Sequence, residues 1–339
     1  MKLTYIVADA EDAKTVKYIL KSKLSLSERL VRKLKYAGQV LRNSLPVHIN
    51  APVCIGDRIE AIIEFDDINE EITPEKMDLD ILYEDDSIIA LNKPPSMVVH
   101  PTSYHLTGTM ANGVLHYLLS KGIRTRIRPV SRLDRDTSGI IIFALNQYVQ
   151  ERLIKQMHEN TYYKEYVGIV CGNFDEASGV INLPIERKPE SIMVRHVSPS
   201  GAPSVTRYEV LERLKGADYV RFILETGRTH QIRVHCQAVG HPLLGDTLYP
   251  YLETQTEGEL RSTANITSCF SENAGCNGLH FPKPAREVIF APVLSSIPLE
   301  RQALHSRKTL FVHPVLGNSM ELEAPIPPDI CKALEILKK

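Results

Sequence analysis

Near the start of the chain, leucine side chains recur at the spacing of an amphipathic helix. The apolar positions of this stretch are Leu26, Leu30, Leu34 and Ala37. At 100° per residue they share one face of a helix. Ser25 followed by Glu28 has the pattern of a capping box at the helix start, and Gly38 predicts a left-handed end. We therefore predict a helix that ends at Gly38.

Residues 58–65 change to an alternation of apolar and charged positions. The apolar positions are Ile59, Ala61, Ile63 and Phe65. A period of two is the pattern of a strand with one buried face. Helix and strand together predict a small α+β unit at the start of the chain.

The remainder of the chain is dominated by runs of strand length. Ile88–Leu91 and Gly139–Leu145 are apolar, and further strand-like runs are Tyr166–Val170, Val205–Leu211, Tyr219–Leu224 and Lys308–His313. One amphipathic helix is predicted from Val149, Leu153 and Met157, with Asn160 as its stop. Helices do not alternate regularly with these strands, which argues against a doubly wound fold. We therefore predict an α+β fold with a mixed, largely antiparallel sheet and flanking helices.

Charge divides the chain near residue 75. Residues 21–43 carry seven Lys or Arg and one Glu, whereas residues 64–86 carry eleven acids and one Lys. The acidic stretch shows no clear periodicity before Ile81, as expected of a solvated linker. We predict two domains, residues 1–75 and residues 76–339.

The composition of the 339 residues is that of an ordinary globular protein. Hydrophobic residues make up 43% and charged residues 24%, which argues against a disordered chain or a coiled coil. The net charge of -1 speaks against a uniformly basic nucleic-acid binder. No apolar run approaches the roughly 18–20 residues of a membrane span, and no signal peptide pattern opens the chain. Six cysteines without a CxxC pair indicate reduced thiols. We predict a cytoplasmic protein with no membrane partner.

The most unusual local chemistry lies in a basic loop that precedes the strand from Gly139. Residues 121–135 hold six Lys or Arg and a single acid, Asp134. Nearby positive charge favours the ionised carboxylate, which then serves as a nucleophile or an electrostatic stabiliser rather than as a general acid. Taken alone, the loop more often indicates a turn, because residues 136–139 are rich in turn formers.

A second polar segment, residues 225–235, follows a predicted strand. Its basic or titratable side chains are Arg228, His230, Arg233 and His235. Burying two arginines without a partner of opposite charge costs free energy, so we expect these side chains to lie near phosphates or a carboxylate. The five-residue separation of the two histidines suits neither a helix face nor a strand face, which argues against a metal site.

Five sequence blocks, in order over about 250 residues, resemble the RluA family of pseudouridine synthases. The blocks are Asn92-Lys93-Pro94 with Val99-His100-Pro101, Arg132-Leu133-Asp134 with Thr137-Ser138-Gly139, Lys164-Glu165-Tyr166, Gly227 to Arg233 with His241-Pro242 and Gly245-Asp246, and Arg301 to His305 with His313-Pro314 and Glu323-Ala324-Pro325. The resemblance implies an isomerase that converts uridine in structured ribosomal or transfer RNA to pseudouridine. It implies neither a cofactor nor a metal.

The resemblance also implies roles for individual residues. Asp134 stands at the family's essential aspartate and would act on the ribose, either as nucleophile at the anomeric carbon or as base at its neighbour. Arg233 would pair with this aspartate, and Tyr166 would stack on the flipped base and help with proton removal. Arg132 would hold the nucleotide out of its helix. The remaining polar side chains of the fourth block, Arg228, His230 and Gln231, are expected to bind RNA.

The first unit resembles the RNA-binding domain named after ribosomal protein S-four. The match lies in residues 27–43, SERLVRKLKYAGQVLRN, and in residues 47–63. It implies that a basic helix face presents Arg29, Arg32 and Lys35 to RNA phosphates. The alternative is a small capping domain whose basic face is only solvated.

Residues 252–295 form an atypical segment where the family has a short connection. Cys269, Cys276 and His280 in this segment lack a fourth metal ligand, so we expect a polar insertion without a metal.

Two other functions compete with the synthase. The first is an RNA-binding protein that keeps the fold without catalysis, and the intact set of Asp134, Tyr166 and Arg233 argues against it. The second is a carboxylate-dependent nucleoside hydrolase, which needs a second carboxylic acid as proton donor. Asp136 is the nearest candidate, and its basic surroundings disfavour that role. We expect the synthase to act as a monomer.

Overall fold

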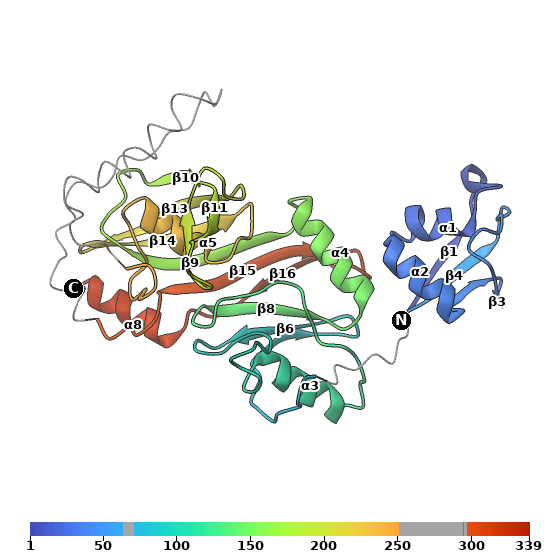
Figure 1. Ribbon diagram of the computed structural model, residues 1–339, viewed down its shortest axis with the longest axis horizontal. Coiled ribbons are helices and arrows are strands. Elements are labelled where there is room, and N and C mark those ends of the chain that lie inside the picture. The colour runs from blue at the N-terminus through green and yellow to red at the C-terminus, as the bar shows by residue number, and fades with distance from the viewer. Residues whose placement is uncertain (64–70, 251–293, 295–296) are drawn as a thin grey trace, which may run out of the picture.

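The computed structural model describes residues 1–63, 71–250, 294 and 297–339. Except for Leu294, the predicted insertion at 252–295 lies outside these residues. The described strands form two larger sheets, of four and ten strands, and one two-stranded ribbon (Figure 1).

The first 63 residues build the four-stranded sheet, in the order β1-β4-β2-β3. Its strands are β1 (Lys2–Ile6), β2 (Val40–Arg42), β3 (Leu45–Pro46) and β4 (Arg58–Ile62). The helical segments are η1 (Asp9–Glu11), α1 (Val16–Tyr18), η2 (Ile19–Lys23) and α2 (Glu28–Ala37). Strand β4 pairs antiparallel with both β1 and β2, so the strand predicted at 58–65 is confirmed with an earlier end.

The predicted basic helix corresponds to α2, with two corrections. Its N-cap is Ser27, whose hydroxyl accepts a hydrogen bond from the Leu30 amide, and not Ser25. Ser25 has a φ of 55°, in the left-handed region, whereas a serine N-cap that accepts a hydrogen bond typically has an extended backbone. Gly38 ends the helix with a φ of 66°, as predicted. The second correction concerns Ala37, which is exposed rather than part of the buried face.

The ten-stranded sheet follows the order β10-β13-β14-β9-β15-β8-β6-β5, with β16 paired to β15 and β7 to β8. Its strands are β5 (Ile81–Glu84), β6 (Ile88–Lys93), β7 (Arg128–Pro129), β8 (Ser138–Ala144), β9 (Tyr163–Cys171), β10 (Ser178–Asn182), β13 (Val205–Leu214), β14 (Ala217–Leu224), β15 (Leu304–Val312) and β16 (Ser319–Glu323). Strands β11 (Ile185–Arg187) and β12 (Arg195–Val197) form the ribbon. Strand β15 is parallel to β8 and antiparallel to β9. The α+β fold with a mixed, largely antiparallel sheet is therefore confirmed.

Four longer helices of the described residues accompany this sheet. They are α3 (Met110–Ser120), α4 (Gln147–His158), α5 (Gln231–Ala238) and α8 (Pro328–Leu337). Helix α4 is the predicted one, and Asn160 lies just beyond its end with a φ of 55°. Helices α3, α5 and α8 were not predicted from the sequence.

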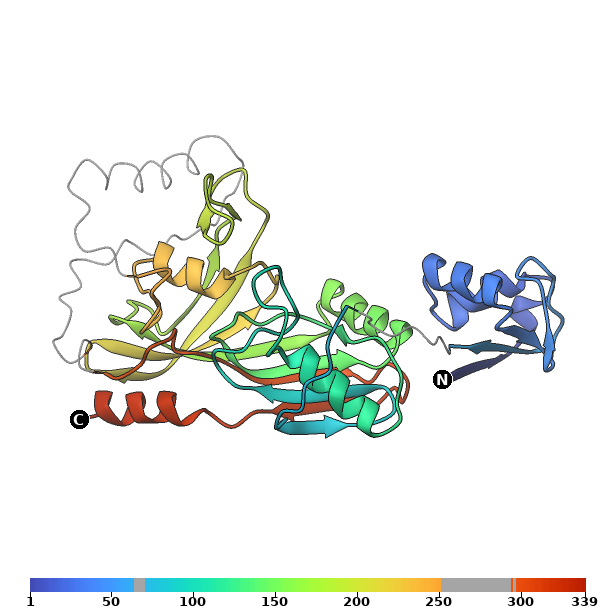
Figure 2. The same cartoon turned by 60° about the horizontal axis from the view of Figure 1, so that its bottom comes forward.

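Strand β9 separates two cores, because its side chains alternate between the faces of the sheet. Tyr166 and Val170 pack in one core with residues of α5. Val167 and Ile169 pack in another with residues of α8. Helices α5 and α8 accordingly cover opposite faces of the sheet, as Figure 2 shows.

The parallel contact between β8 and β15 requires a glycine at position 139. Gly139 has a φ of 107°, which L side chains rarely adopt. A Cβ atom here would lie 2.2 Å from the carbonyl oxygen of Ser306 in β15. Figure 1 shows β15 in red running between β9 and β8. The loop that carries Asp134 leads directly into this tight crossing.

Candidate active site

A cleft of about 1090 Å³ lies on the side of the ten-stranded sheet that α5 covers. Its lining comes from the loop before β8, from β9, and from the loop that leads into α5. The predicted site residues along it are Arg132, Asp134, Tyr166, Arg228, His230, Gln231 and Arg233. The fold thus brings three separate sequence segments to one cavity.

Asp134 is partly accessible in this cleft, with 23% of its side chain exposed. Its Oδ2 accepts a hydrogen bond of 3.1 Å from Nη1 of Arg233. Its Oδ1 lies 3.8 Å from Nε2 of His230, beyond hydrogen-bond distance. The two carboxylate oxygens therefore differ: Arg233 holds one, and the other remains available to a substrate.

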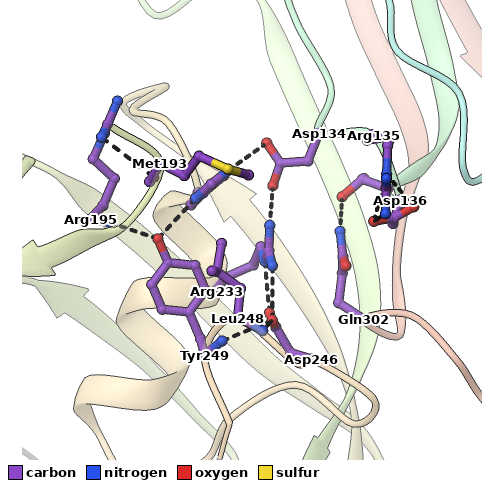
Figure 3. Close-up of polar contacts among 12 residues, drawn as sticks. Asp134, Arg135, Asp136, Met193, Arg195, Arg233, Asp246, Leu248, Tyr249 and Gln302 are labelled. Carbon is purple, nitrogen blue, oxygen red and sulfur yellow. Dashed lines mark hydrogen bonds and ion pairs between the residues drawn. The ribbon is translucent and has the colours of Figure 1, made fainter. Parts of the chain in front are cut away.

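Arg233 links Asp134 to a second, fully buried carboxylate (Figure 3). Its Nε and Nη2 donate to the two oxygens of Asp246 at 2.7 and 2.8 Å. The backbone amides of Leu248 and Tyr249 donate to the same carboxylate. Burial alone would lower the pKa of Arg233, but Asp246 and then Asp134 outweigh it and raise this pKa. The guanidinium therefore stays charged and is held in one orientation.

The loop around Asp134 is anchored through its backbone by buried groups. The ammonium of Lys93, which is fully buried, donates to the carbonyl oxygens of Pro94, Met97 and Arg135, each at 2.8 Å. Burial lowers the pKa of Lys93 to about 7, while the negative charge of Asp136 opposes this shift. Arg301 Nη1 donates to the carbonyl of Asp136 at 3.0 Å. These contacts fix the residues that follow Asp134.

Tyr166 lies on β9 and lines the same cleft, with only 7% of its surface exposed. Burial raises the pKa of its phenol, and the charge of Asp134 raises it further. The hydroxyl is thus protonated in the free protein. The predicted roles of Tyr166, stacking on the base and help with proton removal, stay predictions.

The predicted RNA-binding residues of the cleft divide into available and unavailable side chains. Arg132 and Arg228 are exposed on the lining, where their charges can reach RNA. Gln231 is 2% exposed, and its amide bonds only to groups of the protein, including Thr226 and the carbonyl of Val205. These contacts shape the loop before α5, and the predicted RNA contact of Gln231 stays a prediction.

The basic residues of the first unit stand apart from this cavity. Arg29, Arg32 and Lys35 are exposed on α2, and none of them lines the cleft. The structure thus leaves them accessible without bringing them to Asp134.

Comparison with known proteins identifies the family. A family model described as RNA pseudouridylate synthase matches residues 87–238, which include Asp134, Tyr166 and Arg233. The ribosomal large subunit pseudouridine synthase D of Pasteurella multocida is 34% identical over 300 residues, covering 86% of this chain and 83% of the relative. The chain belongs to the RluA family of RNA pseudouridine synthases. It is an isomerase that acts on RNA.

Other members of this pseudouridine synthase family match over most of the chain. The uncharacterized RNA pseudouridine synthase YjbO of Bacillus subtilis is 32% identical, covering 92% of this chain and 95% of the relative. The solved structure of human RNA pseudouridylate synthase domain containing 4 superposes with a TM-score of 0.53 at 20% identity, over 76% of this chain and 92% of that one. This structural likeness shows a shared fold.

Three residues that structure the synthase site were not identified as functional from the sequence. Asp246 stood out only as part of a matching block, although an acid close to a segment with two arginines is a signal for ion pairing. Lys93 likewise stood out only as part of a block. Tyr249 has no local signal, because its contacts with His230 and Arg233 depend on the tertiary fold.

The described part of the synthase shows no metal centre and no membrane helix. Within residues 1–63, 71–250 and 297–339, no three His, Cys, Asp or Glu side chains are grouped to hold a metal ion. The three candidate ligands of the insertion, Cys269, Cys276 and His280, lie outside the described residues. No helix of this same part is long and apolar enough to cross a membrane.

Proposed function

We propose that Asp134 carries out the isomerisation of uridine in the cleft and that structured ribosomal RNA is the substrate. The observation that supports this most directly is the Asp134–Arg233 contact at the cleft, which leaves one carboxylate oxygen accessible. Several of the similar proteins are named as pseudouridine synthases of the large ribosomal subunit. Transfer RNA is the second substrate class to test.

The proposed reaction needs no group beyond the side chains of the cleft. The bond between C1′ of the ribose and N1 of uracil breaks, the base turns, and a bond forms between C1′ and C5. The C5 hydrogen leaves as a proton and N1 takes one up, so the product is an isomer of the substrate. Asp134 acts on the ribose in this sequence, as nucleophile at C1′ or as base at its neighbour.

The target base must first leave its stack to reach Asp134. A cleft of about 1090 Å³ is slightly larger than most small-ligand sites, which span about 300–1000 Å³, and we expect it to accommodate a flipped nucleotide. Tyr166 would stack on the base, and the exposed Arg132 would hold the displaced strand. Arg233 orients Asp134 through its hydrogen bond of 3.1 Å to Oδ2.

The first unit is proposed as a separate RNA-binding domain, with a boundary near residue 75. The exposed Arg29, Arg32 and Lys35 on one helix support this proposal. Their charges would hold the RNA by its phosphates while the cleft selects the uridine. We propose that the enzyme acts as a monomer.

The test is a tritium-release assay on ribosomal RNA labelled at C5 of uracil. The wild-type protein is expected to release tritium to water, and Asp134→Asn is expected to release none. Asp136→Asn is the matched control, because Asp136 lies in the same loop and pairs with Arg135 instead of Arg233. Release from transfer RNA alone would overturn the ribosomal assignment. Free uracil as product would favour the hydrolase, and equal release by Asp134→Asn would refute the role of Asp134.

A further inference from the structure

The hydroxyl of Tyr249 joins the active site to the β11–β12 ribbon. Tyr249 is only 1% exposed. Its Oη accepts a hydrogen bond of 2.8 Å from the backbone amide of Arg195 in β12 and lies 2.9 Å from Nδ1 of His230. Its ring lies 5.0 Å below the guanidinium of Arg233. Figure 3 shows Tyr249 beside the line from Asp134 through Arg233 to Asp246.

Counting protons assigns the tautomer of His230. A tyrosine hydroxyl has one proton to donate, and the Arg195 amide can only donate to it. The described residues offer the Tyr249 proton no acceptor other than Nδ1 of His230. Nδ1 is therefore the unprotonated ring nitrogen, and the neutral ring carries its proton on Nε2. Burial lowers the pKa of His230, which keeps the ring neutral near pH 7.

The protonated nitrogen faces the reactive carboxylate. Nε2 of His230 lies 3.8 Å from Oδ1 of Asp134, the oxygen that Arg233 leaves available. Contacts in catalytic sites are often long in the free enzyme and shorten when the substrate binds. A movement of under about 1 Å would bring this pair within hydrogen-bond distance.

The backbone conformation of His230 supports a specific role for the position of its ring. His230 is the N-cap residue of α5 and has the left-handed conformation, with a φ of 58° and a ψ of 19°. Residues other than glycine adopt this conformation at an energetic cost. This strained backbone lies at the residue whose ring faces Asp134.

We propose that Tyr249 is a positioning residue that fixes His230 as the tautomer protonated at Nε2, so that this N–H orients Oδ1 of Asp134 toward the ribose. The inference rests on the proposed role of Asp134. It changes the predicted role of His230 from an RNA contact to a partner of the aspartate.

The first test is Tyr249→Phe, which removes the hydroxyl and keeps the ring below Arg233. We expect the single-turnover rate of tritium release to fall by about tenfold or more, with the Kd for RNA changed less than about twofold. The ¹⁵N spectrum of histidine-labelled protein is expected to show that His230 no longer carries its proton on Nε2 alone. Tyr219→Phe is the matched control, because Tyr219 is also buried and does not line the cleft.

A second pair of variants separates the N–H donor from the shape of the ring. His230→Gln places an amide N–H near the position of Nε2, whereas His230→Ala removes it. Both variants carry the same left-handed backbone, so strain affects them alike. We expect Gln to retain more of the rate than Ala at equal RNA affinity.

A wild-type rate and an unchanged ¹⁵N spectrum for Tyr249→Phe would overturn this inference. Asp134→Asn is measured in parallel to keep the two proposals apart. If Asp134→Asn is inactive while Tyr249→Phe is fully active, only the role of Tyr249 fails. If Asp134→Asn is active, the proposed function fails first.

Discussion

Nη1 of Arg233 donates a hydrogen bond of 3.1 Å to Oδ2 of Asp134. The same guanidinium forms a bidentate salt bridge with Asp246, whose side chain is fully buried. One arginine therefore holds the carboxylate of Asp134 and compensates the buried charge of Asp246. Its removal should damage activity and stability together.

Arg233→Leu is expected to lower the free energy of unfolding by about 3–5 kcal/mol, because it leaves Asp246 buried without a partner. Tritium release should fall at least about 100-fold, because Asp134 loses its orientation. The double variant Arg233→Leu with Asp246→Leu should recover much of the stability and none of the activity. Urea unfolding and the tritium assay measure the two effects. A stable Arg233→Leu would show that Asp246 does not depend on this arginine.

Gly139→Ala is expected to destabilise the fold strongly, because its Cβ would meet the Ser306 carbonyl of β15 at 2.2 Å. Gly317→Ala is the matched control. Gly317 also has a positive φ, of 73°, but nothing lies within 4 Å of its added Cβ. The control should show only the conformational cost, about 1 kcal/mol. Equal destabilisation of both variants in urea unfolding would mean that the β8–β15 approach tolerates a methyl group.

Lys164 is expected to make RNA binding depend on pH near 8. It lines the cleft on the same face of β9 as Tyr166, and burial lowers its pKa to about 8. Among the described residues no carboxylate forms a salt bridge with it, so we expect an RNA phosphate to be its partner. As the pH rises through about 8, the ammonium gives up its proton and the RNA affinity should fall.

The check is fluorescence anisotropy with labelled RNA between about pH 7 and pH 9, the range that spans this pKa. Lys164→Gln should bind more weakly at the lower pH and show a flatter pH profile than the wild type. Lys93 also has a lowered pKa, of about 7, but its ammonium is enclosed by carbonyl oxygens and does not line the cleft. A wild-type pH profile in Lys164→Gln would contradict the assignment.

The stability of the fold should fall in mild acid because of two buried histidines. His235 and His305 are fully buried, and burial lowers the pKa of each to about 4. The unfolded chain binds these protons near pH 6.5, so it gains protons before the folded state does. Stability is therefore present above about pH 6.5 and falls away as the pH drops toward about 4, by up to about 3 kcal/mol per histidine.

Urea unfolding at several pH values between about 4 and 7 measures this change. His235→Gln should reduce the slope of stability against pH, whatever its own effect on stability at neutral pH. His48→Gln, which replaces an exposed histidine, is the control and should leave the slope unchanged. Identical slopes in all three proteins would exclude His235 as a source of the pH dependence.

The basic face of α2 should make RNA binding sensitive to salt. Replacing Arg29, Arg32 and Lys35 by Gln is expected to reduce the slope of log K against log salt, by about 0.7–0.9 for each RNA phosphate that is no longer neutralised. The exposed Lys332 of α8, changed to Gln, is the control. An unchanged slope in the triple variant would favour the alternative of a solvated capping domain.

The strands could be predicted from the sequence, and so could Asp134 as a candidate residue, whereas helix α5 could not. The apolar run from Gly139 is buried in β8, and the mixed sequence of β13 alternates between buried and exposed side chains. Helix α5 instead buries Gln231, Arg233 and His235, which are polar. Hydrophobic periodicity does not predict a helix whose buried face carries the polar side chains of a site. His235, for example, bonds through Nε2 to the carbonyl of Leu183 rather than to solvent.

The partners of Asp134 could be predicted only through the family resemblance. Arg233 is 99 residues from Asp134 in the chain. A local sequence pattern does not show which residues so far apart in the chain are in contact. The contacts of Tyr249 with Arg195 and His230 are also set by how the ribbon and α5 pack. Sequence patterns thus identify the chemical groups of the site, while the tertiary fold determines their orientation.

The position of β15 has a consequence for folding during translation. This strand lies between β9 and β8, but in the chain it follows both of them and also α5. During translation, Asp134 and Arg233 therefore emerge from the ribosome before the strand that joins the two halves of their sheet. Domains generally fold as units once their sequence is available. The contact between Asp134 and Arg233 is thus expected to become stable only after β15 has been synthesised.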